Sequence, residues 1–424
     1  MTEERYITEK GIEIYGIRNP SQHGFFASLF LRSGSMHETD AEAGITHLLE
    51  HILIKNVNKV MGDGLYPTLD RLGIEFNAGT YSEMVQFYVS GAADKAAACC
   101  EILTRLLSDI ILTPDEISVE KDRVKAEIRE ASERTSLSGF SSAAVWGETS
   151  LARPITGSAV SVSKISLRGL REYAKRVFTR KNIFFYLTGA YTDADVLTLS
   201  RLIDSYDICS ADAPGDNLAP VPDSFMKRKP LVNIKNADFC AVRFTFDFDM
   251  SELTLAETDL LYDTLLSGYN SRFFIEMSER RGLFYDTGGA LDRYKNIGTL
   301  HFTYELRPEA LYEALAVTVD ILNSLKSKEL AEDECMRAAY VDNAYMLYDD
   351  NRELNFTFAY DNHIMNAGYG GIEDRRAAYS RVTPRRLREL AKKLFRSENL
   401  TFTMKGSKKK TDTEKILEIL KRLG

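Results

Sequence analysis

The sequence predicts an α+β fold built from two homologous α/β-sandwich domains that a linker joins. Three observations lead to this fold class. The chain has 424 residues, more than a single hydrophobic core of ordinary size accommodates. Strand-like and helix-like segments alternate along its length. The C-terminal half also repeats part of the N-terminal half at a constant offset.

The repeat is clearest between residues 165–189 and 382–406, which share 10 identities in 25 positions when they are aligned without gaps. Matching pairs include Glu172 with Glu389 and Asn182 with Asn399. The offset between the two segments is close to half of the chain length. Duplication of one domain of about 200 residues therefore explains the pattern.

The segment between the two copies is rich in proline, which is typical of a linker. Four of the ten prolines fall there, namely Pro214, Pro220, Pro222 and Pro230. We therefore expect an N-terminal domain over residues 1–210, a linker over 211–230 and a C-terminal domain over 231–424.

Each copy contains its own series of strands and helices. In the first copy, strands are expected at 5–18 (two, around Lys10-Gly11), 25–31, 76–90 (two) and 182–189, and helices at 44–56, 66–72, 95–111, 115–133, 166–178 and 192–205. In the second copy, strands are expected at 240–249, 299–305 and 400–406, and helices at 253–266, 272–281 and 308–327. The stretches 332–350 and 376–395 are expected to be largely helical.

The helix at 44–56 carries the pattern H-x-x-E-H as His47, Glu50 and His51. Positions i and i+4 lie one above the other on a helix, so both imidazoles can reach one metal ion. Two histidines with a further carboxylate suit a tetrahedral zinc site that keeps one position open for water. Glu50 lies beside that position and can accept a proton from the water. The order of the motif is that of the inverzincin peptidases.

An ordinary buried helix with a polar edge is the alternative interpretation of this segment. Its apolar stripe consists of Ile45, Leu48, Leu49, Ile52 and Leu53. Two observations favour the metal. The chain has only six histidines, and two of them fall here. Unpaired imidazoles on an otherwise apolar helix would also be costly to bury.

A second charged helix, at 115–133, carries Glu120 and Glu127 seven positions apart and therefore on one face. Taken alone, such a stretch is usually a solvated face with helical ion pairs.

Charge and apolar patterning exclude two classes of partner. The net charge is −8 without a basic stripe, which argues against a nucleic-acid-binding protein and is compatible with a basic peptide ligand. No apolar run approaches the length of a membrane span, and the polar start of the chain shows no signal peptide. The five cysteines lack C-x-x-C spacing, so we expect reduced thiols in a cytoplasmic protein.

The residues around the motif resemble the pitrilysin/insulinase-type zinc peptidases, in particular the smaller two-domain kind similar to the subunits of mitochondrial processing peptidase. The resemblance covers essentially the whole chain. It implies two duplicated domains that form half of a clam-shell chamber. The matching positions are Gly34, Ser35, Glu38, Gly44, His47, Glu50, His51 and Lys55.

The same resemblance implies roles for residues outside the motif. In the family, the third zinc ligand follows the second histidine at a characteristic spacing, with another Glu seven positions before it. Glu127 has that spacing from His51, so Glu127 is the expected third ligand and Glu120 is expected to orient a ligand histidine. Glu130 is the alternative third ligand. Asn77 and Ala78 match an edge strand that pairs with the substrate backbone.

The second half departs from the family pattern. Residues 271–274 and 281–285 match a substrate-clamping segment, and Tyr285 is expected to stabilise the developing oxyanion. Packing beside Phe284 is the alternative role of Tyr285. Members that act alone usually carry an Arg seven positions before this Tyr, where this chain has Ser278. Arg280 or Arg281 is the candidate replacement.

The second copy also lacks the metal motif. At the offset of the repeat, His47, Glu50 and His51 fall opposite a Thr, a Ser and a Gly, which are Thr264, Ser267 and Gly268. We therefore expect one metal site, in the N-terminal domain.

These observations predict a cytoplasmic zinc endopeptidase that cleaves short or unstructured peptides, leader or precursor peptides among them. Glu50 is the expected general base and zinc the cofactor. Because the clamping Arg is missing, the expected partner is a homologous metal-free subunit, or else a second copy in a homodimer. The alternative is a non-catalytic peptide-binding or scaffold subunit with a relict metal site.

Overall fold

The computed structural model describes residues 1–133, 137–210, 217–228, 231–237, 240–284, 286–407 and 409–424. The chain forms two compact units. The first unit comprises the described residues within 1–134, 153–218 and 345–374. The second comprises those within 135–152, 219–344 and 375–424.

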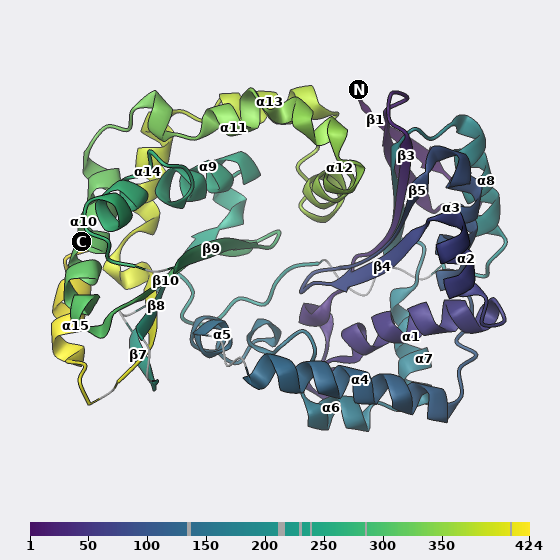
Figure 1. Ribbon diagram of the computed structural model, residues 1–424, viewed down its shortest axis with the longest axis horizontal. Helices are drawn as coiled ribbons and strands as arrows, with labels where there is room; N and C mark the ends of the chain where they lie inside the picture. Colours follow the sequence, from purple (N-terminus) through teal and green to yellow (C-terminus); the bar gives the residue numbers. More distant parts are fainter. Residues whose placement is uncertain (134–136, 211–216, 229–230, 238–239, 285, 408) are drawn as a thin grey trace. The chain divides into compact units, whose positions relative to one another are not determined.

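The first unit contains a six-stranded sheet of order β1-β2-β6-β3-β5-β4 (Figure 1). Strands β2 and β6 are parallel and the other neighbours are antiparallel. The bounds are β1 Glu3–Ile7, β2 Glu13–Arg18, β3 Gly24–Leu31, β4 Glu75–Thr80, β5 Val85–Ala92 and β6 Ile183–Gly189. Strand β4 therefore forms one edge of this sheet.

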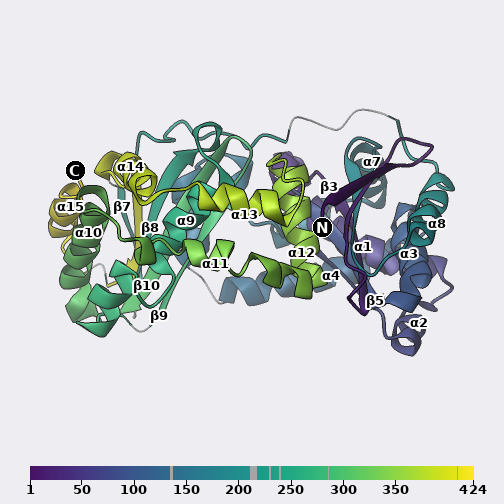
Figure 2. The ribbon, with the colours of Figure 1, turned by 90° about the horizontal axis from the view of Figure 1, so that it is seen from above.

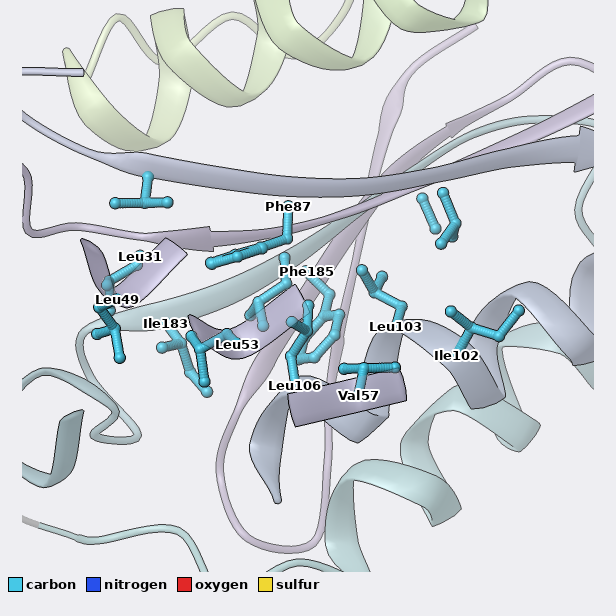
Figure 3. Close-up of a cluster of buried hydrophobic side chains, with 14 of the residues drawn as sticks. Leu31, Leu49, Leu53, Val57, Phe87, Ile102, Leu103, Leu106, Ile183 and Phe185 are labelled. Atoms are coloured by element: carbon cyan, nitrogen blue, oxygen red, sulfur yellow. The ribbon is translucent and has the colours of Figure 1, made fainter. Parts of the chain in front are cut away.

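Helices cover one face of the first sheet and enclose its hydrophobic core. Figure 3 shows Leu49, Leu53 and Val57 of one helix packed against Phe87 and Phe185 of the sheet. The helices of this part of the chain are α1 Ile45–Val60, α2 Leu65–Leu72, α3 Ala96–Thr104, α4 Pro114–Glu133, α6 Ala159–Lys164, α7 Leu167–Val177 and α8 Asp193–Asp204.

The second unit repeats this sheet with the order β7-β11-β8-β10-β9. Its strands are β7 Leu231–Asn236, β8 Cys240–Asp249, β9 Asp286–Arg293, β10 Ile297–Leu306 and β11 Leu400–Gly406. Its parallel pair, β7 with β11, corresponds to β2 with β6. The remaining helices of the chain are α5 Leu137–Trp146, α9 Leu255–Leu266, α10 Leu311–Ser327, α11 Arg337–Val341, α12 Asn351–Phe358, α13 Ile372–Ser380, α14 Pro384–Leu394 and α15 Thr413–Lys421.

The internal repeat coincides with the observed elements. At the offset seen in the sequence, α7 falls on α14 and β6 falls on β11, with both bounds of each element in agreement. Together with the shared strand order, this agreement confirms the prediction of two homologous α/β domains.

Each compact unit contains segments from both sides of the proline-rich segment, so a single cut there does not separate the two units. The segment with α5 packs with the second unit, and the segment with α12 packs with the first. At the offset of the repeat, α5 falls on residues 354–363, which overlap α12 and the π-helix Ala359–Ile364. Equivalent segments of the two copies are therefore exchanged. Residues 211–216 and 229–230 of the expected linker lie outside the described residues.

Helix α12 covers the face of the first sheet that is opposite to the core helices, and both views show it beside β3 (Figure 2). Asn355 is fully buried there. Its Oδ1 accepts a hydrogen bond from the hydroxyl of Ser28 at 2.7 Å, and its Nδ2 donates to the carbonyl of Tyr186 at 2.9 Å. These bonds attach α12 to β3 and β6.

Helix α5 is attached to the second sheet in a comparable way. Ser141 shares a hydrogen bond with Thr403 of β11. Arg228 forms a buried bidentate ion pair with Asp247 of β8 at 2.8 and 3.1 Å and also donates to the carbonyls of Ala144 and Val145. One buried guanidinium therefore joins β8 to the end of α5.

Several expected elements differ from the observed ones. The helix predicted at 95–111 ends at Thr104 and continues only as the 3-10 turn Arg105–Leu107. The helix predicted at 272–281 contains the π-helix Phe274–Glu279. As expected, 332–350 and 376–395 are largely helical, but the first consists of short pieces and the second is interrupted at 381–383, ahead of Pro384, because proline cannot donate to the preceding turn. In the part of the chain that is described, no helix has the length and apolarity to cross a bilayer.

We expect Arg228→Ala to lower the free energy of unfolding by about 3–5 kcal/mol, because the substitution leaves the Asp247 carboxylate buried without its partner. Denaturant unfolding followed by fluorescence of Trp146, the only tryptophan, measures this change in the second unit. Arg168→Ala is the control, since Arg168 and Glu172 form an exposed pair whose loss should leave the free energy of unfolding nearly unchanged. Equal losses in both variants would contradict the assigned role of Arg228.

Candidate metal centre

A tight approach of the backbone fixes the start of α1. Gly44 has a φ of 87°, and a Cβ at this position would lie 2.6 Å from the carbonyl oxygen of Thr156. Only glycine tolerates both constraints. The buried carboxylate of Glu38 accepts hydrogen bonds from the N–H groups of Gly44 and Thr46, each at 2.8 Å. Glu38 thus satisfies donors that every helix leaves unpaired at its first turn.

The two faces of α1 have different roles. The apolar residues Leu48, Leu49, Ile52 and Leu53 are buried in the core, as the alternative interpretation of the motif expected. His47 and His51 project from the other side with 14% and 19% of their side chains exposed, and their ring centres lie 4.8 Å apart. The motif is therefore the polar edge of a core helix, and its two imidazoles lie next to each other.

Helix α4 lies antiparallel to α1, and a ladder of charged contacts connects the two helices. Lys59 contacts Glu116 at 2.9 Å and Lys55 contacts Glu120 at 3.1 Å. Further along, Nε2 of His51 lies 3.6 Å from Glu127 Oε1, and Nε2 of His47 lies 3.7 Å from Glu127 Oε2. From one contact to the next, the residue number falls along α1 and rises along α4, as expected for antiparallel helices. This arrangement brings the Glu127 carboxylate to the two histidines.

His47, His51 and Glu127 form a group whose potential ligand atoms all lie within 4.8 Å of one another. Two ligands bound to one zinc ion at roughly 2.0–2.1 Å in tetrahedral geometry are about 3.3 Å apart. The separations of 3.6 and 3.7 Å are near this value and too long for hydrogen bonds. The donor set therefore fits zinc. Within the described residues, the alternative ligand Glu130 does not belong to this group.

Burial and neighbouring charges determine the protonation of the histidines. Burial, with the nearby His51, lowers the pKa of His47 to about 4, so its imidazole is neutral at pH 7 as a metal ligand requires. Burial alone would also lower the pKa of His51. The carboxylates of Glu120, Glu127 and Glu50 outweigh that effect and raise the pKa of His51. Burial raises the pKa of Glu50.

Glu120 lies near His51 on the side away from Glu127. Its side chain is 2% exposed, and its Oε2 lies 3.8 Å from Nδ1 of His51. Lys55 and Arg123 each contact its Oε1 at 3.1 Å. Although burial opposes ionisation, His51 and these two cations lower the pKa of Glu120. Glu120 is thus an ionised carboxylate on the far nitrogen of His51.

Strand β4 carries the two residues expected to bind the substrate backbone. Asn77 and Ala78 lie on this edge strand, opposite Tyr88 and Phe87 of β5. The N–H of Ala78 donates to Oδ1 of Asn77 at 2.9 Å. The last residue of the strand, Thr80, donates a hydrogen bond to Oε2 of Glu50. Sequence reasoning did not identify Thr80, because no local pattern shows which hydroxyl meets a helix that is distant in the sequence.

The residues predicted in the second half are less fully described. Tyr285 lies outside the described residues, so its role stays a prediction. Ser278 lies within the π-helix Phe274–Glu279. The guanidinium groups of Arg280 and Arg281 both pair with Glu276 of this helix. Each candidate replacement for the clamping Arg is therefore engaged by one carboxylate.

Comparison with known families identifies the class of protein. The model described as insulinase (peptidase family M16) matches residues 14–159, and the model described as peptidase M16 inactive domain matches residues 164–339. The chain belongs to peptidase family M16.

Individual relatives are similar to this chain at low identity. An uncharacterized zinc protease of Mycobacterium tuberculosis is 25% identical over 334 residues, covering 74% of this chain and 73% of the relative. The uncharacterized zinc protease YmxG of Bacillus subtilis is 24% identical over 335 residues, covering 77% and 80%. The mitochondrial-processing peptidase subunit beta of Blastocladiella emersonii is 26% identical over 193 residues, covering 45% and 42%.

Solved structures agree in fold. A peptidase M16 inactive domain from Pseudomonas fluorescens matches with a TM-score of 0.81 at 16% identity, covering 96% of this chain and 98% of that one. The first half of the periplasmic protease PqqL from Escherichia coli matches with a TM-score of 0.80 at 14% identity, covering 100% and 96%.

Proposed function

We propose that this protein is a zinc-dependent endopeptidase that cleaves short or unstructured peptides, with leader and precursor peptides among its possible substrates. The observation that carries the proposal is the grouping of His47 and His51 of α1 with Glu127 of α4, beside Glu50 of α1, which the end of an edge strand contacts. Membership of a peptidase family and relatives named zinc proteases support it.

In this proposal His47, His51 and Glu127 hold the zinc ion, and Glu120 keeps His51 in orientation. When bound, zinc acts as a Lewis acid and lowers the pKa of a coordinated water to about 7. Glu50 accepts the proton of the attacking water and then passes it to the leaving amine. Its raised pKa makes the carboxylate a stronger base than an exposed glutamate.

The substrate adds as an extended strand to β4 at Asn77 and Ala78. Such β-augmentation uses main-chain hydrogen bonds and needs a peptide backbone free of its own secondary structure. It therefore favours unstructured peptides over folded proteins. The N–H of Ala78 donates to Oδ1 of Asn77 in the free protein. To pair with a bound peptide, this N–H must leave Oδ1 and donate to a substrate carbonyl instead. Tyr285 remains the predicted stabiliser of the oxyanion.

A second candidate function is a non-catalytic peptide-binding subunit with a relict metal site. The observation in its favour is Ser278 at the position expected for the clamping Arg, with both neighbouring arginines paired to Glu276. A measurement of zinc and of activity in the purified chain distinguishes the two candidates.

We expect Glu127→Ala to lower zinc affinity by at least about 10-fold, because it removes one of three protein ligands. Zinc content after dialysis at fixed free metal, measured by mass spectrometry, gives the affinity. Glu130→Ala is the matched control, one helical turn away on α4, and should keep wild-type zinc content. If Glu130→Ala loses zinc and Glu127→Ala keeps it, the third ligand is Glu130.

We expect Glu50→Gln to keep zinc and the fold but to lose about 100-fold or more of kcat, because the amide cannot accept the proton of the water. Hydrolysis of an unstructured fluorogenic peptide measures kcat, and zinc content and thermal unfolding verify the site and fold. Wild-type activity in this variant would exclude Glu50 as the base. An inactive, zinc-free wild-type chain would favour the non-catalytic alternative.

The assembly that we propose is a heterodimer in which this chain carries zinc and a homologous metal-free chain of similar length supplies the clamping Arg. A Ser hydroxyl cannot replace the bidentate, permanently charged grip of a guanidinium. We expect the zinc-loaded chain alone to cleave an unstructured peptide at least about 10-fold more slowly than the chain mixed with its partner. Full activity of the chain alone, as a monomer or homodimer, would contradict the heterodimer.

A further inference from the structure

Thr80 makes a contact to the proposed general base that no motif assigns. Its hydroxyl donates a short hydrogen bond to Oε2 of Glu50. Within the part of the chain that the structure describes, this is the one hydrogen bond to the Glu50 carboxylate. Thr80 is the last residue of β4 and pairs with Val85 across the turn to β5. A hydroxyl at the end of the edge strand thus reaches the helix that carries the motif.

The loop after β3 contacts the turn that follows Thr80. The N–H groups of Ser35 and Met36 donate to the carbonyls of Tyr81 and Ser82, at 3.2 and 2.8 Å. A Cβ on Gly34 would lie 2.3 Å from the Tyr81 carbonyl oxygen, so the loop and the turn are in direct contact.

The same loop continues to Glu38, which accepts the first N–H groups of α1. One short segment therefore fixes both the end of β4 and the start of α1. The segment is joined to the turn after Thr80 by backbone hydrogen bonds and to the start of α1 by the Glu38 carboxylate, so hydrogen bonds at both ends hold the Thr80 donor and the Glu50 carboxylate relative to each other.

We infer that Thr80 is a positioning residue that orients the carboxylate of Glu50 for proton transfer, and this inference rests on the proposed function. The hydrogen bond occupies Oε2 and leaves Oε1 to accept the proton. Without the donor, the carboxylate can rotate about its terminal torsion, which is broad for glutamate. A misplaced reacting group lowers the rate of the chemical step more than it lowers substrate affinity.

The position of Thr80 also joins substrate binding to catalysis. Asn77 and Ala78, which we propose to bind the substrate backbone, precede Thr80 by three and two positions on the same strand. The strand that receives the peptide therefore ends in the group that orients the base. An extended peptide paired with β4 stabilises the strand and, with it, the hydroxyl.

The test compares Thr80→Val, which removes the donor at nearly constant volume, with Thr80→Ser, which retains it. Thr198→Val is the control, because Thr198 lies partly exposed on α8 and donates only within its own helix, to the Ala194 carbonyl. For each variant, kcat and KM are measured on an unstructured peptide. Zinc content is measured in parallel, and peptide affinity is measured in a Glu50→Gln background.

We expect Thr80→Val to lower kcat by about 10- to 100-fold, the usual effect of losing an outer partner of a metal site. KM, zinc content and peptide affinity should stay within about 2-fold of the wild type, and Thr80→Ser should recover most of kcat. Wild-type kcat in Thr80→Val, loss of zinc, or an equal defect in Thr80→Ser would overturn the inference. A wild-type chain that binds no zinc and is inactive would instead overturn the proposed function.

Discussion

The antiparallel pairing of α1 with α4 is the interaction on which the candidate metal centre depends. Lys59 and Lys55 of α1 meet Glu116 and Glu120 of α4, and the next turns of the ladder bring Glu127 to the two histidines. The cations of this ladder neutralise carboxylates that would otherwise repel one another. The ligand group is therefore assembled from two helices whose register is set by ion pairs outside it. Because Glu120 is almost fully buried, its pairing with Lys55 and Arg123 is screened little by solvent.

Local periodicity was sufficient to predict part of the site. His47, Glu50 and His51 are so close in the sequence that helical geometry alone places them on one side of α1. Glu127 is on a different helix, and only the resemblance to a family singled it out from Glu130. Thr80 could not be predicted, because its contact with Glu50 depends on how β4 and α1 are brought together by the loop at Gly34–Glu38. Short-range patterns determine which residues share a face, whereas tertiary packing determines which faces meet.

The fold shows the same division. The duplication was visible in 25 aligned positions, and the observed bounds of α7, α14, β6 and β11 agree with it. The exchange of the α5 and α12 segments was not visible, because both segments have ordinary helical composition and no local signal states which sheet a helix will cover. The sequence predicted a largely helical stretch at 332–350, but local propensity did not show that it is broken into short helical pieces.

The exchanged segments have a consequence for the ancestry and the divisibility of this chain. If the N-terminal half were expressed alone, Ser28 and the Tyr186 carbonyl would lose their hydrogen bonds to Asn355. If the C-terminal half were expressed alone, Arg228 would lose the two carbonyls of α5 to which it donates. Each half of the sequence therefore lacks the helix that covers one face of its own sheet. Reciprocal exchange of equivalent segments is the arrangement produced by a domain-swapped homodimer whose two copies became fused. A chain with this exchange cannot be cut into two continuous halves that each keep these contacts.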